Sequence, residues 1–424
     1  EEPEQILTNT DKEPYMELAQ WKEKLDVWFN DKEPEMFSLL ERIVNMDSFS
    51  HDGGDVNKLG ETLTAWMAEA GFRTARLPKQ PSPPDERWMD GLGNTFCARS
   101  HAEEAGPGVA FIGHMDTVFP AGTAAARPFR LDRAADRATG PGVLDMKGGL
   151  VINMFVARAL KELDLMPVPM TLTFSPDEEL GSPSTTPLLG RVLNGAHAVL
   201  CTEPGYPGGG VSVERKGSGH LFLEIRGKAA HAGRNYEDGA SAILELAHKI
   251  LAFNEHLDLA SGTTVNTGLI SGGISANSVA PNAQARIHCT FKTVEAGRRL
   301  VEEIRADVAK TFIPGTSSHV SGGLRLYPLT FTPKVQALWE LARQAGEALG
   351  RPVECIRSKG AAESGYCASI LNLPTLCSLG PEGTGLHSDA EYITPSTLLP
   401  RAKLVALTAL QAAHAFDASP EVQL

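Results

Sequence analysis

Three consecutive carboxylates, Asp177, Glu178 and Glu179, follow an apolar run that ends at Phe174. Neighbouring like charges repel, and at the end of a buried strand they also lose hydration, so the run costs stability unless it meets a cation or a reacting proton. A solvated turn is the ordinary explanation of a run of charges. The rest of the sequence decides between a solvated turn and a chemical site.

Other polar residues stand directly after apolar runs in the same way. His114 and Asp116 follow VAFIG, and Asp145 lies in the loop GPGVLDMKGG. Glu203 follows VLCT, and His387 lies far downstream in GTGLHSDAEY. Each alone is typical of a hydrogen-bonded pair, a turn or a solvated strand end. Because functional groups of open parallel sheets gather beyond the carboxyl ends of the strands, we expect the set to lie together.

The donor types in this set suit a pair of zinc ions, with cobalt or manganese as substitutes. Imidazole nitrogen and carboxylate oxygen bind such ions at ~2.0–2.2 Å. Two metals ~3.5–4 Å apart need one bridging carboxylate and about two further ligands each. Two histidines and three carboxylates fit that requirement. Asp116 is two residues after His114 and can contact its imidazole without binding metal, which fixes the tautomer of the ring.

The two glutamates of the opening run can have different roles. Adjacent side chains of an extended segment point in different directions, so one can bind metal while its neighbour does not. We assign Glu179 as a ligand. We assign Glu178 as the general base that takes a proton from water and later delivers it to a leaving nitrogen. The order of these two roles rests on the resemblance described below.

Hydrophobic periodicity predicts the elements that position these residues. Helices are expected at 15–45, 148–163, 334–349 and 396–415, with a further helix that has Asp55 as N-cap and ends before Gly71. Strands are expected at 72–77, 109–112, 170–174, 198–202, 353–357 and 374–379. Strands that alternate with helices predict an α/β fold with a mainly parallel sheet.

The pattern changes near Val213. The segment GHLFLEIRG alternates polar and apolar residues, as a half-exposed antiparallel strand does. It precedes a helix at 239–257, strands near 263–270 and 284–293, a helix at 295–312 and a strand near 318–327. This β-α-β-β-α-β order is that of a ferredoxin-like α+β unit. We therefore predict a catalytic domain made of residues 1–212 and 328–424, with residues 213–327 as an inserted domain.

Composition excludes several classes of function. The chain has 424 residues and a formal net charge of −13 at pH 7, which opposes binding to nucleic acid or to an anionic membrane surface. No apolar run approaches the ~20 residues needed to span a bilayer. Its six cysteines lack the spacing of a thiolate metal site. Small molecules or short peptides are the expected substrates.

The first residue is Glu, which predicts a removed leader or tag and leaves the cytoplasm and the periplasm both open.

The chain resembles the di-zinc exopeptidase family in an ordered set of motifs: HMDTVFPAGTAAARPFRLDRAADRATGPGVLDMKGG, DEELGS, TEPG, GKAAHAG and HSDAEY. This family contains carboxypeptidase G-type glutamate carboxypeptidases, aminoacylase-1, acetylornithine deacetylase and succinyl-diaminopimelate desuccinylase. The similarity runs from about residue 35 to the C-terminus and is closest to the glutamate carboxypeptidase branch.

The resemblance implies a role for each candidate residue of the centre. Asp145 would bridge the two metals. His114 and Glu203 would complete one site, and Glu179 and His387 the other. Glu178 falls on the catalytic glutamate of the family. The family also implies a cis peptide bond between Asp145 and Met146.

The resemblance also implies a role for the inserted domain. In relatives this domain mediates dimerisation, and the histidine of a motif like HAG reaches the active site of the partner. His231 would then hydrogen-bond the oxyanion of the reaction. Asn277 matches a family asparagine that approaches the substrate. Without the resemblance, both residues are typical of turns and loops.

Two motifs depart from the glutamate carboxypeptidase pattern. The family has Asp-x-Arg on the last inner strand, where the arginine grips the substrate carboxylate. We expect CTFKT to place Cys289 and Phe291 there, with Lys292 on the opposite face. The loop GAAESG, which starts at Gly360, has a glutamate where the family has an aspartate. We expect Gly360 and Arg325 to contact the substrate, with Arg325 as the replacement cation.

These observations favour a zinc hydrolase that cleaves an amide bond. A carboxypeptidase that releases a glutamate-like C-terminal residue from N-acyl or peptidyl substrates ranks first, and a deacylase or amidohydrolase for small N-acyl compounds is the alternative. An inactive binding protein would lack a ligand or the base, and none is missing. A nucleotide-binding protein would need a GxGxxG motif or a P-loop, which GLGNTF and DMKGG do not form.

Overall fold

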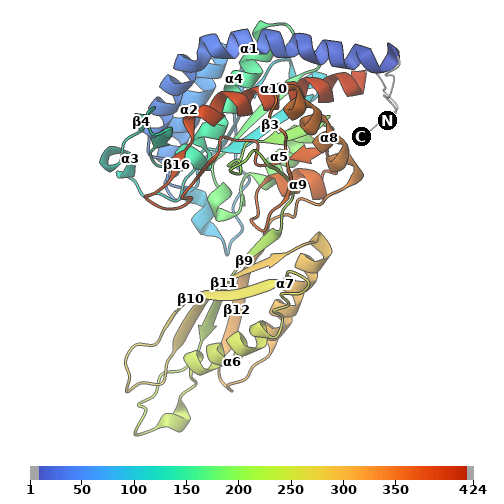
Figure 1. Ribbon diagram of the computed structural model, residues 1–424. Helices are drawn as coiled ribbons and strands as arrows, with labels where there is room; N and C mark the ends of the chain where they lie inside the picture. The colour runs from blue at the N-terminus through green and yellow to red at the C-terminus, as the bar shows by residue number, and fades with distance from the viewer. Residues whose placement is uncertain (1–8, 418–424) are drawn as a thin grey trace.

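The computed structural model describes residues 9–417 and has two lobes. Figure 1 shows a larger lobe, which contains both ends of the described chain, and an elongated smaller lobe built from the middle of the sequence. The two lobes meet where strand β9 (Gly217–Arg226) leaves the larger lobe. The chain therefore crosses between them before β9 and again after β12 (Ser317–Leu326).

The larger lobe contains a six-stranded mixed sheet in the order β1-β2-β6-β3-β7-β14. Neighbouring strands from β6 to β14 run parallel, whereas β1 and β2 pair antiparallel at one edge. The strand bounds are β1 Arg73–Leu77, β2 Thr95–Arg99, β3 Val109–His114, β6 Met170–Ser175, β7 Ala198–Cys201 and β14 Thr375–Leu376. The carboxyl ends of β3, β6 and β7 consequently lie at one edge of the sheet.

Helices cover both faces of this sheet, so every residue of β3 and β6 is buried. One face packs against α1 Asn9–Val44, α2 Gly53–Glu69, α4 Gly148–Glu162, α8 Pro333–Ala348 and α10 Leu398–Asp417. The other face packs against α5 Thr186–Leu193 and α9 Ser364–Ser369. Within residues 9–417, no helix is both long and apolar enough to span a bilayer.

The predicted N-cap of α2 is wrong by three residues. The side chain of Asp52, rather than that of Asp55, accepts hydrogen bonds from the backbone N–H groups of Gly54 and Asp55 at 3.0 and 3.2 Å. These are free first-turn donors, which an N-cap carboxylate satisfies. Gly71 follows the helix with a φ of +78°, a left-handed conformation that glycine adopts without steric cost.

The smaller lobe is an antiparallel sheet with two helices on one face. Along the chain the order is β9, α6 Ala242–Asn254, β10 Thr264–Gly272, β11 Asn282–Phe291, α7 Val294–Ala309 and β12. In space the strands are ordered β10-β11-β9-β12, with antiparallel pairing throughout. Odd-numbered side chains of β11 are buried against the helices. Even-numbered side chains therefore lie on the open face of the sheet.

Two further sheets connect distant parts of the chain in the larger lobe. One has the order β15-β16-β5-β4, with bounds β4 Arg130–Asp132, β5 Arg137–Thr139, β15 Gly383–Thr384 and β16 Tyr392–Ile393. The other pairs β8 Val211–Glu214 with β13 Cys355–Arg357. Since β16 pairs with β5, the segment that carries His387 lies beside the segment that leads to Asp145.

Candidate active site

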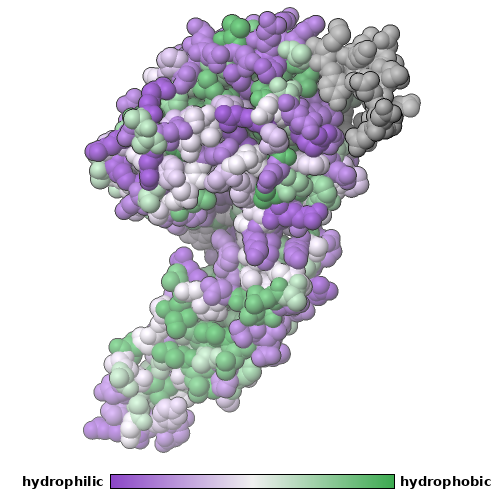
Figure 2. Space-filling model, in the orientation of Figure 1, coloured by the Kyte–Doolittle hydropathy of each residue, from purple (hydrophilic) through white to green (hydrophobic). Residues whose placement is uncertain are grey.

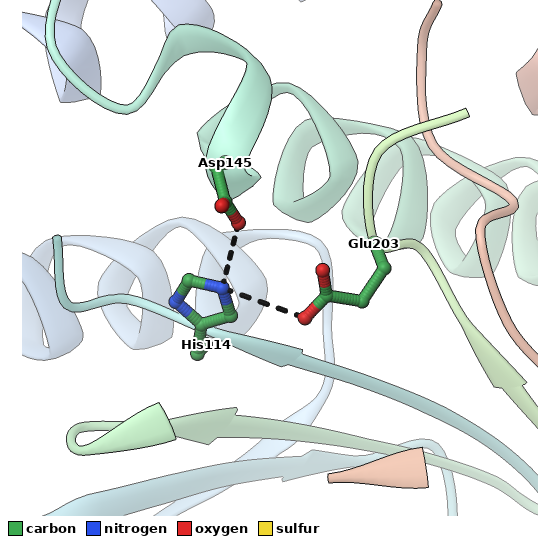
Figure 3. A group of neighbouring side chains, drawn as sticks. All are labelled: His114, Asp145 and Glu203. Atoms are coloured by element: carbon green, nitrogen blue, oxygen red, sulfur yellow. Dashed lines mark hydrogen bonds and ion pairs between the residues drawn. The ribbon is translucent and has the colours of Figure 1, made fainter. Parts of the chain in front are cut away.

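His114 is the last residue of β3, and its imidazole meets two carboxylates (Figure 3). Its Nε2 atom lies 3.1 Å from Oδ1 of Asp145 and 3.6 Å from Oε1 of Glu203. Glu203 comes from the loop after β7, which is the parallel neighbour of β3. Asp145 comes from the turn Val143–Lys147 before α4. Three separate elements thus bring these side chains together.

A second trio shares Asp145. Nε2 of His387 lies 3.3 Å from Oδ2 of Asp145 and 3.2 Å from Oε2 of Glu179. In each trio one ligand atom per residue falls within 4.8 Å of the others, a geometry that can hold a metal ion. The aspartate therefore presents one oxygen to each trio. The predicted cis peptide bond between Asp145 and Met146 is confirmed.

The electrostatics of this cluster fit divalent cations. Four carboxylates, Asp145, Glu178, Glu179 and Glu203, face two histidines. Burial, followed by the charge of Glu203, raises the pKa of Glu178 well above its usual value. Burial and Asp145 do the same to the pKa of Glu203. Carboxylates this crowded need compensating positive charge to stay ionised, and their oxygens with imidazole nitrogen form a donor set that zinc accepts.

Asp116 lies against His114 and against the backbone of Glu178 and Glu179. The Nδ1 atom of His114 lies 3.4 Å from its Oδ1 atom and 3.0 Å from its carbonyl oxygen. The backbone N–H groups of Glu178 and Glu179 donate to its carboxylate at 3.1 and 3.3 Å, and Ser50 Oγ donates at 2.7 Å. One buried carboxylate thereby orients the imidazole of His114 and the backbone of both glutamates.

The three carboxylates of the opening run have separate surroundings. Asp177 is buried, and one of its oxygens accepts hydrogen bonds from the backbone N–H and the hydroxyl of Ser184, both at 2.7 Å. Glu179 belongs to the second trio, whereas Glu178 belongs to neither. Glu178 is nevertheless only 8% exposed beside them. The run is therefore not a solvated turn.

Sequence reasoning missed Glu391, which is fully buried. Its carboxylate accepts backbone hydrogen bonds from Gly142, Leu144 and Asp145 at 2.9, 2.9 and 3.0 Å. It thus fixes the turn that carries Asp145. The available signal was its place in HSDAEY, four residues after His387.

A cleft of about 620 Å³ lies between the two lobes and reaches the second trio at Glu179. The larger lobe contributes aromatic and acidic side chains, including His51, Asp85, Glu86 and Trp88. The smaller lobe contributes the open face of its sheet, including His220, Phe222, Arg286, His288 and Arg325. A substrate in this cleft would contact both lobes.

The model of peptidase family M20/M25/M40 matches residues 110–411. The chain belongs to this family. It is a metallohydrolase that acts on carbon–nitrogen amide bonds, in a family that includes dinuclear metal-binding peptidases.

Named relatives agree with this placement. Carboxypeptidase G2 of Pseudomonas sp. (strain RS-16) is 29% identical over 383 residues, which cover 87% of each chain. An acetylornithine deacetylase of Edwardsiella ictaluri is 25% identical over 406 residues, which cover 89% of this chain and 97% of the relative.

Solved structures share the fold. The M20 metallo-carboxypeptidase Sso-CP2 of Sulfolobus solfataricus matches with a TM-score of 0.71 and 15% identity, over 90% of this chain and 99% of that one. A dinuclear metal-binding M20 peptidase of Bacillus subtilis matches with a TM-score of 0.60 and 15% identity, over 91% and 99% of the two chains.

One expectation about this M20 peptidase is wrong. Cys289 and Phe291 do not occupy the position of a carboxylate clamp, since both are fully buried in the core beneath the helices of the smaller lobe. Side chains two residues apart share a face of a strand, so the open face of β11 carries Arg286 and His288. An arginine therefore does face the cleft, five residues before Phe291, where the sequence motif suggested its loss.

Of the two other residues expected to contact the substrate, Arg325 lines the cleft and Gly360 does not. Arg325 lines the cleft, but its Nη2 atom lies 2.6 Å from Oε2 of Glu86, so its charge is already paired across the two lobes. Gly360 does not line the cleft among the described residues. Its carbonyl accepts a hydrogen bond from the buried Arg215 at 3.2 Å.

His231 and Asn277 lie together but far from the trios of their own chain. The backbone N–H of Ala232 donates to the carbonyl of Asn277 at 2.9 Å, and His231 pairs with Ser278 in a β-bridge. His231 follows the end of β9, and Asn277 lies in the connection between β10 and β11 beside it. Strand β9 continues from His220 at the cleft for six more residues, or ~20 Å of extended strand, before it reaches these loops. Both His231 and Asn277 are exposed there.

Proposed function

We propose that this M20 peptidase is a carboxypeptidase that releases a C-terminal, glutamate-like residue from N-acyl or peptidyl substrates. The observation that carries the proposal is Arg286, which lines the cleft that reaches Glu179. Within the part of the chain that the structure describes, its guanidinium forms no ion pair and lies 5.7 Å from the centre of the Phe222 ring. Its guanidinium can hold a carboxylate with two parallel hydrogen bonds. An unpaired arginine near an amide-cleaving centre suits a substrate with a free carboxylate.

We assign five side chains as ligands of two zinc ions, with cobalt or manganese as substitutes. His114, Asp145 and Glu203 would hold one ion, and Asp145, Glu179 and His387 the other. When bound, the ions polarise the amide carbonyl and lower the pKa of the attacking water. The excess of negative charge in the cluster supports this assignment, because the carboxylates outnumber the histidines that face them.

Glu178 is the proposed general base and acid. It lies beside both trios without belonging to either, and it keeps a buried carboxylate whose pKa is raised. As base it accepts a proton from the attacking water. As acid it delivers that proton to the leaving nitrogen, so that water and the amide become a carboxylic acid and an amine. Asp116 orients Glu178 by accepting a hydrogen bond from the backbone N–H of Glu178.

We also propose that the smaller lobe, residues 213–327, forms a homodimer. Strand β10 is an edge of its sheet, and an exposed edge can pair with a second copy. Apolar side chains gather on this lobe (Figure 2) and are more than 40% exposed on α6 and near β10, namely Ile243, Leu244, Leu251, Leu269, Ile270 and Ile274. Such a patch marks an interaction surface. A dimer would also let His231 and Asn277 reach the site of the partner, where His231 would hydrogen-bond the oxyanion.

A deacylase for small N-acyl amino acids is the second candidate. It would use the same metals, base and Arg286, since its substrate also carries a free carboxylate. The acetylornithine deacetylase relative, which the chain matches over 97% of its length, favours this candidate. The two candidates differ in the size of the acyl group that the cleft accepts.

Mass spectrometry of a mixed substrate pool tests the proposal. An equimolar pool of N-acyl amino acids and dipeptides is incubated with the enzyme, with chelator and with added zinc. We expect zinc-dependent release of free amino acids, from large as well as small acyl groups. Release from acetyl compounds alone would favour the deacylase. No release by zinc-loaded protein would overturn both candidates.

A further inference from the structure

Two histidines face each other on the open sheet of the smaller lobe. His220 on β9 and His288 on β11 are directly paired in register. Their ring centroids lie 5.1 Å apart, and the ring planes are inclined by 57°. Both side chains line the cleft. Neither the metal ligands nor the proposed base involves them.

The row beside this pair contains Arg286. It is paired in register with Phe222, and its guanidinium lies 5.7 Å from the centre of the phenylalanine ring. Arg286 and His288 are two residues apart on one strand, so their Cα atoms are ~6.8 Å apart on the same face. The two carboxyl carbons of an extended glutamate are separated by four covalent bonds, or ~5 Å. Both carboxylates of one dicarboxylic residue can therefore reach this strand together.

We propose that His220 and His288 form a subsite for the side-chain carboxylate of a dicarboxylic amino acid, while Arg286 holds its α-carboxylate. The assignment rests on the proposed carboxypeptidase function and adds the residues that select its substrate. The histidine pair gives an acidic side chain two N–H donors on a face where Phe222 would favour an apolar one.

The charges around the pair determine how it responds to pH. Burial, followed by His288 and Arg325, lowers the pKa of His220 to about 4, and burial lowers the pKa of His288. The charged or titratable groups that line the same cleft are His51, Asp85, Glu86, Glu179, Arg286 and Arg325, while Arg305 of α7 donates to the carbonyl of Gly322. These lowered pKa values keep both histidines neutral at pH 7. Glu86 is already paired with Arg325.

A carboxylate bound between the two imidazoles favours their charged form. The pKa of the pair in the complex then lies above its value in the free enzyme, and binding takes up a proton. Substrates with acidic side chains should therefore bind better as the pH falls toward the pKa of the complex. A side-chain amide of the same shape gains nothing from this protonation.

The test compares N-benzoyl-glutamate with N-benzoyl-glutamine, which share the metals, Glu178 and Arg286. We expect the ratio of their kcat/KM values to rise about tenfold from about pH 8 to about pH 6, the effect of one charge-assisted hydrogen bond. Effects of pH on the shared groups cancel in this ratio.

Matched variants separate specificity from folding. His220→Gln and His288→Gln keep a side-chain N–H donor of similar length but cannot gain a proton, and the double variant should make the ratio independent of pH. His319→Gln is the control, because His319 is exposed on β12 in register with Glu224 and does not line the cleft. It should keep the wild-type pH dependence.

Calorimetry with free glutamate gives a second measurement. Measured in two buffers of different ionisation enthalpy, glutamate binding to wild type should be accompanied by uptake of at most about one proton near pH 6.5. Binding to the double variant should be accompanied by less uptake. Cleavage of both substrates with a ratio that does not change with pH would overturn the subsite and leave the carboxypeptidase function intact. Cleavage of neither by zinc-loaded enzyme would contradict the function instead. Proton uptake that the double variant loses would then still support the subsite, and equal uptake would overturn it.

Discussion

The carboxylate of Glu391 accepts a hydrogen bond of 3.0 Å from the backbone N–H of Asp145, 246 residues earlier in the chain. It also accepts from the backbone N–H groups of Gly142 and Leu144, so it fixes the backbone of the turn that carries Asp145. The loop that carries His387 and the turn that carries Asp145 are thereby fixed to each other, which makes Glu391 part of the support of the proposed metal centre.

Glu391→Gln should weaken metal binding while the protein still folds. The amide nitrogen cannot accept a hydrogen bond, so at least one buried backbone N–H loses its partner, at a cost of about 1–3 kcal/mol. We expect zinc affinity to fall about 10- to 100-fold, measured by competition with a chelator. Glu382→Gln is the control, because Glu382 accepts from the backbone of Gly208 away from both trios. Equal zinc affinity in wild type and Glu391→Gln would contradict the supporting role.

Glu178→Ala should bind both metals and lose turnover. If Glu178 transfers protons without ligating, its removal costs roughly 10²- to 10⁴-fold in kcat. Glu179→Ala is the neighbouring control, which should lose metal from the second trio. Metal content by elemental analysis and kcat on the same samples distinguish the two. A Glu178→Ala enzyme with near wild-type turnover would remove it as the base.

Arg286→Lys should raise KM for substrates with a free α-carboxylate. Lysine keeps the charge but cannot form two parallel hydrogen bonds, so we expect a loss of about 10- to 100-fold in kcat/KM. Lys292→Ala, at an exposed position just after the same strand, should have little effect. If substrates with an amidated C-terminus are cleaved as well as free acids by wild type, Arg286 is not a carboxylate clamp.

His231→Ala should fold and dimerise but turn over roughly 10²- to 10³-fold more slowly, the usual cost of one oxyanion donor. A mixture of His231→Ala and Glu178→Ala protomers provides the decisive measurement. In the mixed dimer one site combines an intact Glu178 with the intact His231 of the partner, so activity should partly return. Full activity of a monomeric wild-type protein would exclude this arrangement.

The buried carboxyl group of Glu363 should make the stability of the fold depend on pH. Burial raises its pKa to about 7, although a hydrogen bond from Ser175 of 2.6 Å opposes the shift. Because the folded-state pKa lies above the unfolded value, the folded form holds the proton more tightly. Stability therefore falls as the pH rises through this interval, by on the order of 3 kcal/mol, and stays lower above it.

Glu363→Gln removes this titration and keeps an oxygen for Ser175. In chelator-treated protein, urea unfolding should give similar stability for the variant and wild type near pH 5, and a more stable variant near pH 8. A stability difference that is the same at both pH values would show that the carboxyl is not titrating in this interval.

Much of the larger lobe follows from local sequence. The strands that end at His114 and before Glu203 are short apolar runs, and every position is buried in a sheet covered on both faces, so periodicity and composition suffice to find them. Helix α1 starts at Asn9 rather than at residue 15. The wrong N-cap of α2 arose because Asp52 and Asp55 both stand near the same terminus, and only the backbone direction selects the capping carboxylate.

The clamp could not be placed in the same way. Faces of a strand alternate with every residue, so an error in register moves a whole set of side chains to the other side. Arg286 and Cys289 lie three residues apart on one strand, and the packing of α6 and α7 decides that the cysteine is buried while the arginine faces the cleft. The pairing of Arg325 with Glu86 depends on how two lobes approach, which neither segment encodes alone.

The sequence by itself determined which chemical groups are available: two histidines, their carboxylate partners and the glutamate pair after β6. Residue type and position after an apolar run are local properties, so they can be identified without coordinates. Only the tertiary structure decided which groups share a site, because parallel pairing of β3 with β7 brings His114 to Glu203, and pairing of β16 with β5 brings His387 to Asp145. Contacts between residues this far apart in the chain are set by packing, not by local preference.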